Sequence, residues 1–432
     1  MRPPSMNPVG QLTYLLICSV VALTGESAAQ EWAVTDLGDL GPGSEFVAAY
    51  DLNNRGQVTV DCLVYVGNDP TLGCLWSHGQ LQALPEPSGA RSARARAIND
   101  AGDMAGDANY AADTFPYLWT NGQVISLGTL GTGRVAVAFG INASAQVVGA
   151  SLLDDSPFPE AHAFLWNDSL IDLGTFTGGS TEDSVAYDIN DDGVIVGSSQ
   201  RANQSGYTIA VMWQDGQIVD LGALPGDRWS EAVAINNLGQ IVGTSAQTYD
   251  ANGKDAVLWS DGQIIQIGPL EPPTPPYSHF FSECFDINDF GEIVGRGIVN
   301  PYLTVGFLWR NGEFTLTTEL VPSGFEWRLV NPVAINNAGQ IACTGIHSIE
   351  TWRVRAFVLT PPECRGFPRG DANCDGAIDN FDIDPFVDAL TNVDRYAAEH
   401  GACNWLCNLD INRDGVVNNF DIDPFVMLLA GG

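Results

Sequence analysis

One sequence pattern, repeated seven times between residues 30 and 360, limits what this chain can fold into. Each copy carries an asparagine directly after Leu or Ile, and these asparagines are 43 to 52 residues apart. They are Asn53, Asn99, Asn142, Asn190, Asn236, Asn288 and Asn336. Such a period is typical of a supersecondary unit that buries its apolar face only against its neighbours.

Within each copy, four short β-prone runs alternate with turn signals. In the fifth copy these runs lie around residues 234–235, 240–244, 256–259 and 263–267. Pairs such as Asp261-Gly262 and Asn121-Gly122 favour two-residue hairpins, because both residues tolerate positive φ angles. No sustained 3.6-residue apolar period appears in this part of the chain. The sequence therefore predicts a mainly β fold, a β-propeller of about seven four-stranded blades, with an open β-solenoid as the alternative.

The two ends of the repeat region complement each other. Residues 32–38 copy the fourth-run text seen at 218–222, whereas the seventh copy ends after Leu359 without a fourth run of its own. We expect the N-terminal strand to complete the last blade, which would remove exposed sheet edges.

A tryptophan also recurs near the end of the third run in six copies. These residues are Trp76, Trp119, Trp166, Trp213, Trp259 and Trp309, and Leu359 takes the place in the seventh copy. Their fixed position indicates core residues; sugar stacking is the alternative. Around Ala161-His162-Ala163-Phe164, residues 32–360 resemble the extracellular HAF repeats. The resemblance implies an extracellular protein and no particular chemistry.

The first 29 residues have the features of a secretory signal peptide. Arg2 precedes an apolar run from Leu12 to Leu23, and small residues precede Gln30. The run is shorter than the roughly 20 residues that span a bilayer. We expect a secreted protein, released or attached to the cell surface, with no membrane insertion after cleavage.

Net charge indicates which partners are disfavoured, and cysteine content indicates the redox compartment. A formal net charge of −34 disfavours nucleic acid. Eight cysteines remain after cleavage, which is compatible with disulfides in an oxidising compartment. Four of them gather near the C-terminus: Cys364, Cys374, Cys403 and Cys407.

After a linker at 361–369, two twelve-residue stretches in residues 370–432 have calcium-loop spacing. The first offers Asp371, Asn373, Asp375, Ala377, Asp379 and Asp382, and the second offers Asp410, Asn412, Asp414, Val416, Asn418 and Asp421. Ala377 and Val416 would contribute only backbone carbonyls. Calcium takes six to eight oxygen ligands, and a glycine at position 6 permits the sharp turn. The sequence predicts two bound Ca²⁺ ions.

Both loops end in Asp, and each is followed by one short helical run with no clear helix before it. With these features, residues 364–430 resemble the dockerin type I family. The resemblance implies a small α-helical module that docks onto a cohesin-like or cell-surface protein, often in systems that degrade polysaccharide. Removing calcium is expected to unfold this module and leave the repeats intact.

An identical eight-residue string occurs at 380–387 and 419–426, although calcium needs only one of its residues. Its first two positions, Asn380 and Phe381 in one copy and Asn419 and Phe420 in the other, are candidate partner-binding residues. The alternative is that both phenylalanines belong to the module core.

No catalytic residues are predicted, because no nucleophile elbow, zinc-protease motif or phosphate loop is present. The first hypothesis is a non-catalytic binding or scaffold protein. The alternative is a glycoside hydrolase or carbohydrate-binding protein with its site in the central funnel, and the acidic residues are too many to single out a catalytic pair. The segments 271–276 and 325–328 depart most from the repeat and are the predicted ligand-binding regions.

Overall fold

The computed structural model describes residues 32–41, 46–63, 71–156, 159–179, 182–201, 207–247, 253–268, 270, 281–300, 303–347, 353–362, 367–400 and 403–430. The predicted signal peptide, the segment 271–276 and Cys364 lie outside these residues. No helix in the described ranges is both long and apolar enough to cross a membrane.

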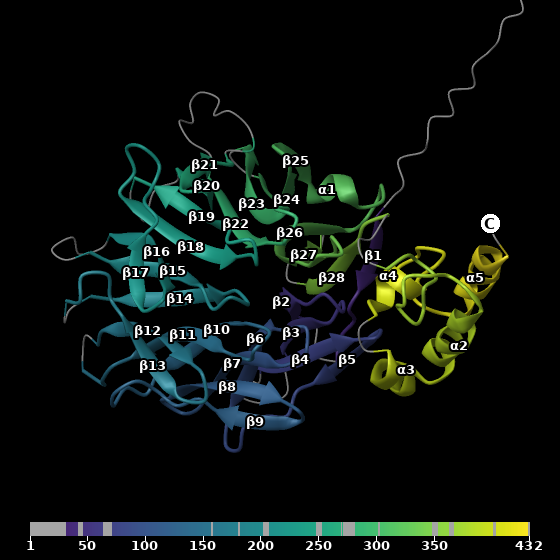
Figure 1. The fold of residues 1–432 in the computed structure, drawn as a ribbon, viewed down its shortest axis with the longest axis horizontal. Coiled ribbons are helices and arrows are strands. Elements are labelled where there is room, and N and C mark those ends of the chain that lie inside the picture. Colours follow the sequence, from purple (N-terminus) through teal and green to yellow (C-terminus); the bar gives the residue numbers. More distant parts are fainter. Residues whose placement is uncertain are drawn as a thin grey trace, which may run out of the picture. The chain divides into compact units, whose positions relative to one another are not determined.

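The repeat region is built from short strands, shown from purple to green in Figure 1. The first and second repeats contain β2 (Phe46–Leu52), β3 (Val58–Leu63), β4 (Thr71–Ser77), β5 (Gln80–Ala83), β6 (Ser92–Ile98), β7 (Met104–Asn109), β8 (Thr114–Thr120) and β9 (Gln123–Ser126). The third and fourth contain β10 (Ala136–Ile141), β11 (Val147–Leu152), β12 (Ala161–Trp166), β13 (Leu170–Gly174), β14 (Ser184–Ile189), β15 (Ile195–Gln200), β16 (Thr208–Gln214) and β17 (Gln217–Asp220).

The fifth and sixth contain β18 (Trp229–Ile235), β19 (Ile241–Ala246), β20 (Lys254–Ser260), β21 (Gln263–Gln266), β22 (Ser282–Ile287), β23 (Ile293–Asn300), β24 (Leu303–Arg310) and β25 (Glu313–Leu316). The seventh contains β26 (Trp327–Ile335), β27 (Ile341–His347) and β28 (Val354–Thr360). Repeats two to six each form one four-stranded antiparallel sheet, as the sequence predicts. One four-residue helix, α1 (Thr317–Leu320), interrupts the β region and was not expected.

The N-terminal strand β1 (Ala33–Asp36) pairs with β28 in antiparallel register, with Val34 opposite Leu359. It therefore supplies the fourth strand that the seventh repeat lacks, as the sequence predicts. The sheets of the first and seventh repeats are also joined, because Phe46 of β2 bridges Val354 of β28.

The first strand of each repeat contacts the first strand of the next, and β26 contacts β2. We call these seven strands the inner strands: β2, β6, β10, β14, β18, β22 and β26. The landmark asparagines lie directly after them and are buried. Asn236 Nδ2 donates to the carbonyl of Asn288 at 2.9 Å, one repeat onward.

The same bond joins every repeat to the next one. Asn336 Nδ2 donates at 3.0 Å to the carbonyl of Asn53, 283 positions earlier in the chain. The other bonds of this cycle run from Asn53 to Asn99, Asn99 to Asn142, Asn142 to Asn190, Asn190 to Asn236 and Asn288 to Asn336. The seven asparagines thus form a closed cycle of hydrogen bonds, which an open solenoid would not make.

Local turn chemistry also follows the sequence. Asn236 Oδ1 accepts from the amides of Leu238 and Gln240, so the side chain shapes the turn that follows it. The hairpin residues Asp261 and Gly262 have φ angles of 51° and 71°, as a turn with two positive φ angles requires.

Four of the six recurrent tryptophans lie in the hydrophobic core. Trp76, Trp119, Trp213 and Trp259 are buried, and Leu359 fills the corresponding position of the seventh repeat. This confirms the core interpretation for these four rings.

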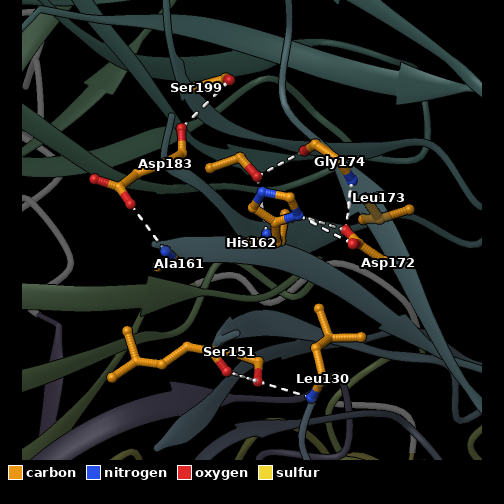
Figure 2. A network of polar contacts seen from close by, with 12 residues as sticks. Leu130, Ser151, Ala161, His162, Asp172, Leu173, Gly174, Asp183 and Ser199 are labelled. Carbon is orange, nitrogen blue, oxygen red and sulfur yellow. Dashed lines mark hydrogen bonds and ion pairs between the residues drawn. The ribbon is translucent and has the colours of Figure 1, made fainter. Parts of the chain in front are cut away.

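Figure 2 shows the surroundings of His162, the histidine of the HAF-like tripeptide. Its Nδ1 lies 2.9 Å from Asp172 Oδ1, across the pair of β12 and β13. Nearby, Asp183 accepts from the amide of Ala161, and Ser151 Oγ accepts from the amide of Leu130. The contact of His162 joins β12 to β13, and the other two contacts join neighbouring segments of the β structure.

The C-terminal region is helical and drawn in yellow in Figure 1. It contains η1 (Asn380–Asp382), α2 (Ile383–Thr391), α3 (Val393–Glu399), α4 (Trp405–Leu409), η2 (Asn419–Asp421) and α5 (Ile422–Leu429). Helices after each loop were expected. The expectation of no helix before the loops was wrong for the second loop, because α4 ends directly before Asp410.

Cysteine pairing differs between the two regions. Cys374 and Cys403 form a disulfide, and Cys407 is also disulfide-bonded. Cys62, Cys74, Cys284 and Cys343 are buried free thiols. The disulfides of the described residues thus lie in the C-terminal region, where a small core gains most from them.

The C-terminal region shares a hydrophobic core with the repeats. Trp76 and Val58 of the first repeat belong to the same buried cluster as Trp405 and Leu406. Polar contacts add to this interface, because Asn404 Nδ2 donates to Gln340 Oε1 at 2.6 Å. This contact was not foreseen from the sequence, which suggested a separate module after a linker.

Candidate functional site

The first predicted calcium loop is organised around two completely buried carboxylates, Asp371 and Asp382. Asp371 Oδ2 accepts from the amide of Gly376 at 2.8 Å. Asp382 Oδ1 accepts from the amides of Ala372 and Asn373, and its Oδ2 accepts from the amide of Asp379. The first and last positions of the loop are therefore fixed by its own backbone.

The second loop repeats this pattern bond for bond. Asp410 and Asp421 are again completely buried. Asp410 Oδ2 accepts from the amide of Gly415 at 2.9 Å, and Asp421 accepts from the amides of Asn412 and Asn418. The glycines at position 6, Gly376 and Gly415, have φ angles of 96° and 85°, which explains the need for glycine at this turn.

The remaining predicted ligand positions lie in the same loops and are more open. Asp375, Ala377 and Asp379 of the first loop and Asn412, Asp414 and Val416 of the second are exposed, while Asn373 and Asn418 are half-buried. In the described ranges, no three Asp, Glu, His or Cys side chains converge as a ready-made metal cage. Each loop instead combines carboxylate, amide and backbone oxygens, which is the donor chemistry that suits calcium.

Electrostatics in both loops disfavour bare carboxylates. Burial, helped by the neighbouring Asp382, raises the pKa of Asp371. Burial also raises the pKa of Asp421, and it raises the pKa of Asp410 to about 6, with Asp421 and Asp414 adding to this shift. A divalent cation would neutralise this repulsion, so the residues present fit the predicted metal.

The duplicated string places its two phenylalanines in different environments. Phe381 is 76% exposed and Phe420 is 77% exposed. The second phenylalanine of each copy is buried instead: Phe386 and Phe425 stack with their ring centroids 4.1 Å apart. The core alternative for Phe381 and Phe420 was therefore wrong. Their exposed neighbours include the other two predicted contact residues, Asn380 and Asn419.

A second candidate site, which the sequence did not reveal, combines side chains of the inner strands with Lys254 of β20 and Arg296 of β23. Half-buried side chains from all seven repeats contact one another in succession, and we call this set the axial belt. It consists of Tyr50, Arg96, Phe139, Tyr187, Glu231, Lys254, Glu283, Arg296 and Asn331.

The first half of the axial belt is aromatic around one cation. The guanidinium carbon of Arg96 lies 5.7 Å from the ring centroids of both Tyr50 and Phe139. The ring of Phe139 lies 5.5 Å from that of Tyr187. Four consecutive repeats are joined in this way.

The second half is polar. Tyr187 hydrogen-bonds to Glu231, whose pKa is raised by burial. Lys254 Nζ lies 3.7 Å from Glu283 Oε1, and Arg296 Nη2 lies 3.0 Å from Glu283 Oε2. Arg296 Nη1 then donates to Asn331 Oδ1 at 3.0 Å, which reaches the seventh repeat.

Behind the first half of the belt lie two buried carboxylates. Arg96 Nε donates to Asp107 Oδ1 at 2.5 Å, and Arg94 Nε lies 3.4 Å from Asp61 Oδ2. Burial raises the pKa of Asp61 to about 6, although the nearby Arg94 opposes the shift. The Oδ1 atom of Asp61 accepts no hydrogen bond from any described residue.

In the predicted ligand region at 325–328, the two aromatic rings pack against the body of the seventh repeat. Phe325 and Trp327 each lie 5.5 Å from the ring of Phe357, and Trp327 also contacts His347. These rings pack against a core cluster of the seventh repeat. Both rings are half-buried, while Glu326 and Arg328 between and beside them are exposed, so a ligand at 325–328 stays a prediction.

No family model matches the chain, and no curated protein matches it. Among solved structures, the β-propeller domain of the Trilobed protease from Pyrococcus furiosus is 9% identical, with a TM-score of 0.48 over 74% of this chain and 97% of that one. A polysaccharide lyase is 9% identical, with a TM-score of 0.43 over 76% and 91%. The Aleuria aurantia lectin, in complex with α-methyl-L-fucoside, is 12% identical, with a TM-score of 0.35 over 65% and 97%. At this level, the likeness does not indicate what the chain binds.

Proposed function

We propose that this chain is an exported, non-catalytic binding protein with a closed seven-bladed propeller as its body. Its C-terminal module binds two calcium ions and docks onto a cohesin-like or cell-surface protein. The observation that carries the proposal is the duplicated loop network, in which Asp371 and Asp382 correspond bond for bond to Asp410 and Asp421.

The exposed phenylalanines support docking. Phe381 and Phe420 each lie one residue before the last position of a loop, so each predicted calcium loop holds one aromatic ring at the surface. Large aromatic side chains carry much of the binding energy of protein interfaces. A partner that recognises one copy would find the same residues in the other.

Propeller closure is supported by two sets of contacts. β1 pairs with β28, and the asparagine cycle returns from Asn336 to Asn53. A closed ring presents the inner strands as one continuous surface. The body would therefore serve as the ligand-binding part and the module as the attachment.

Calcium titration of the metal-free full chain tests the metal part of the proposal. We expect two calcium ions per chain, one after either Asp371→Ala or Asp410→Ala, and none after both changes, because each variant removes a first-position ligand. Asp384→Asn is the matched control, since this exposed residue lies on α2 outside the loop positions. A wild-type stoichiometry of zero would contradict the proposal.

Docking is tested with immobilised cohesin domains in surface plasmon resonance. Phe381→Ala and Phe420→Ala are expected to retain binding singly and to lose it together. Undiminished binding by the double variant would show that these rings are not the docking residues.

A further inference from the structure

We infer that the axial belt is a binding site for a neutral saccharide. The rings of Tyr50, Phe139 and Tyr187 would lie against its C–H faces, and the flanking polar groups would bond to its hydroxyls. The inference deepens the proposed function, because it assumes that the propeller is the ligand-binding body.

The position of the belt favours a ligand site over a core. Core residues of the inner strands, such as Val47 and Ala95, are fully buried, whereas the belt residues that alternate with them are half-buried. Tyr50 and Arg96 are two such residues. A row of large aromatic side chains at partly open positions, with polar groups beside it, is typical of a ligand-binding surface.

Charge balance argues for a neutral ligand. The belt and the two carboxylates behind it are joined by ion pairs, such as Arg296 with Glu283 and Arg94 with Asp61. Four basic groups face four acidic groups: Arg94, Arg96, Lys254 and Arg296 against Asp61, Asp107, Glu231 and Glu283. These eight groups therefore have no net charge among themselves, and the aspartates Asp51, Asp188 and Asp286 on the same strands disfavour an anion.

The chemistry of the lining separates a saccharide from an apolar ligand. An apolar molecule would cover the guanidinium and carboxylate groups without bonding to them, which is costly. A sugar ring has apolar C–H faces for aromatic contact and a rim of hydroxyls for paired donors and acceptors.

One buried carboxylate oxygen beside the belt, Asp61 Oδ1, lacks a hydrogen-bond donor in the part of the chain that the structure describes. Asp61 is 5% exposed, and its Oδ1 has no hydrogen-bond partner among the described residues. Asp61 is paired with Arg94 through Oδ2 and also interacts with the Tyr50 hydroxyl. The other carboxylates of the cluster are engaged by Arg96, Lys254, Arg296 or Tyr187. A ligand hydroxyl would satisfy this buried acceptor, which is unfavourable to leave without a donor.

Calorimetric titration of the full mature chain tests the inference. The probes are neutral hexasaccharides of β-1,4-linked glucose, xylose and mannose, with a galacturonic acid hexasaccharide as the charged comparison. We expect one molecule of at least one neutral probe to bind, and weaker binding of the uronic acid. Failure of all neutral probes, or preference for the uronic acid, would overturn the inference.

Variants locate the site. Phe139→Ala is expected to weaken binding about tenfold, and Tyr187→Phe severalfold, because they remove a stacking ring and a hydroxyl bonded to Glu231. Tyr110→Phe is the matched control, since the Tyr110 hydroxyl pairs with Tyr117 and contacts no belt residue. Wild-type affinity in a folded Tyr187→Phe variant, with unchanged affinity in Phe139→Ala, would place the ligand elsewhere.

Calcium stoichiometry is measured in the same samples. Two bound calcium ions with no saccharide binding would leave the proposed function of the module intact and remove only the axial-belt site. Saccharide binding with no bound calcium would leave the axial-belt site intact and contradict the proposed function of the module.

Discussion

Single asparagines carry an unusual share of the contacts between repeats. Asn236 donates to Asn288 and Gln240 and accepts from two amides of its own turn. We expect Asn236→Ala to lower the free energy of unfolding by about 2–4 kcal/mol, because buried partners lose their hydrogen bonds. Urea denaturation measures the change. Leu238→Ala, at a 70% exposed position of the same turn, is expected to stay within about 0.5 kcal/mol of the wild type.

Three aspartates of the inner strands make stability depend on pH. Each accepts an amide bond from the next repeat: Asp51 from Ile98, Asp188 from Ile235 and Asp286 from Ile335. Burial raises the pKa of Asp51 to about 7 and that of Asp286 to about 8, and it also raises the pKa of Asp188.

The unfolded chain has carboxyl pKa values near 3.9, so the folded state holds these protons more tightly. Their stabilising contribution is complete below about pH 4 and is lost as the pH rises towards 8. We expect the melting temperature to fall over this range and to fall less steeply in Asp286→Asn, which cannot titrate. Identical slopes in the two proteins would show that Asp286 does not titrate in this way.

Among the strands and helices, β1 is expected to contribute the most to thermal stability for its length. Its four residues complete the pairing of β28, and Thr35 Oγ1 also donates to the carbonyl of Gly415 in the second predicted calcium loop. We expect a chain lacking residues 32–38 to melt well below the wild type in calorimetry. Asp36→Asn, which keeps the strand and its backbone pairing, is the control; equal melting of the truncated chain would contradict this.

The two phenylalanines of each duplicated string separate core from surface. Phe386→Ala is expected to destabilise the module by about 3–5 kcal/mol, because Phe386 is buried against Phe425. Phe381→Ala is expected to change stability by less than about 0.5 kcal/mol. Chemical denaturation followed by circular dichroism at helical wavelengths measures both. A reversed order would mean that the two rings exchange roles.

On the scale of the whole molecule, the shared core alters the expected response to calcium. Trp405 belongs to the same buried cluster as Trp76 of the first repeat and contacts His78 of that repeat. The expectation that chelation leaves the repeats unaffected is therefore revised. If the two loops bind calcium as proposed, the ion at 100 times its dissociation constant would stabilise the folded state by about 2.7 kcal/mol per site.

We expect this stabilisation to raise the melting temperature of the repeats together with the module. Scanning calorimetry with calcium and with chelator measures the shift. In Trp405→Ala, which removes the interface ring, the repeat transition is expected to become insensitive to calcium. A wild-type repeat transition that ignores calcium would show that the two regions unfold independently.

The repeats, their hairpin turns and the N-terminal strand of the last sheet could be predicted from the sequence. Their signals are local: the repeat period, the Asn-Gly and Asp-Gly pairs, and the similarity of residues 32–38 to a fourth strand. The hydrogen bond from each landmark asparagine to the next repeat was not predicted. The asparagine also shapes the turn that follows it, and that local role alone already accounts for an asparagine at this position. The axial belt could not be predicted either, because its residues differ from one repeat to the next. Two positions before the Leu or Ile of each landmark, the repeats hold different residues, including Tyr50, Arg96, Phe139, Tyr187 and Phe285. Irregularity within the repeat was the available signal, and it lay on the inner strands.

The exposure of Phe381 and Phe420 could not be predicted either. A phenylalanine next to a helix start is compatible with core and surface alike, and only packing of the two copies decides which ring is enclosed. Stacking of Phe386 on Phe425 occupies the shared interior and leaves the other pair outside.

The pairing of β1 with β28 sets an order of events during synthesis. Asp36 and Arg355, which meet at this seam, are 319 positions apart, and Thr35 and Gly415 are 380 apart. At about 5–20 residues per second, roughly 15 to 60 seconds pass between translation of the first strand and of its partner. β1 is thus made long before the strand with which it pairs. During that interval, its free edge must be kept from pairing with another copy of the same chain.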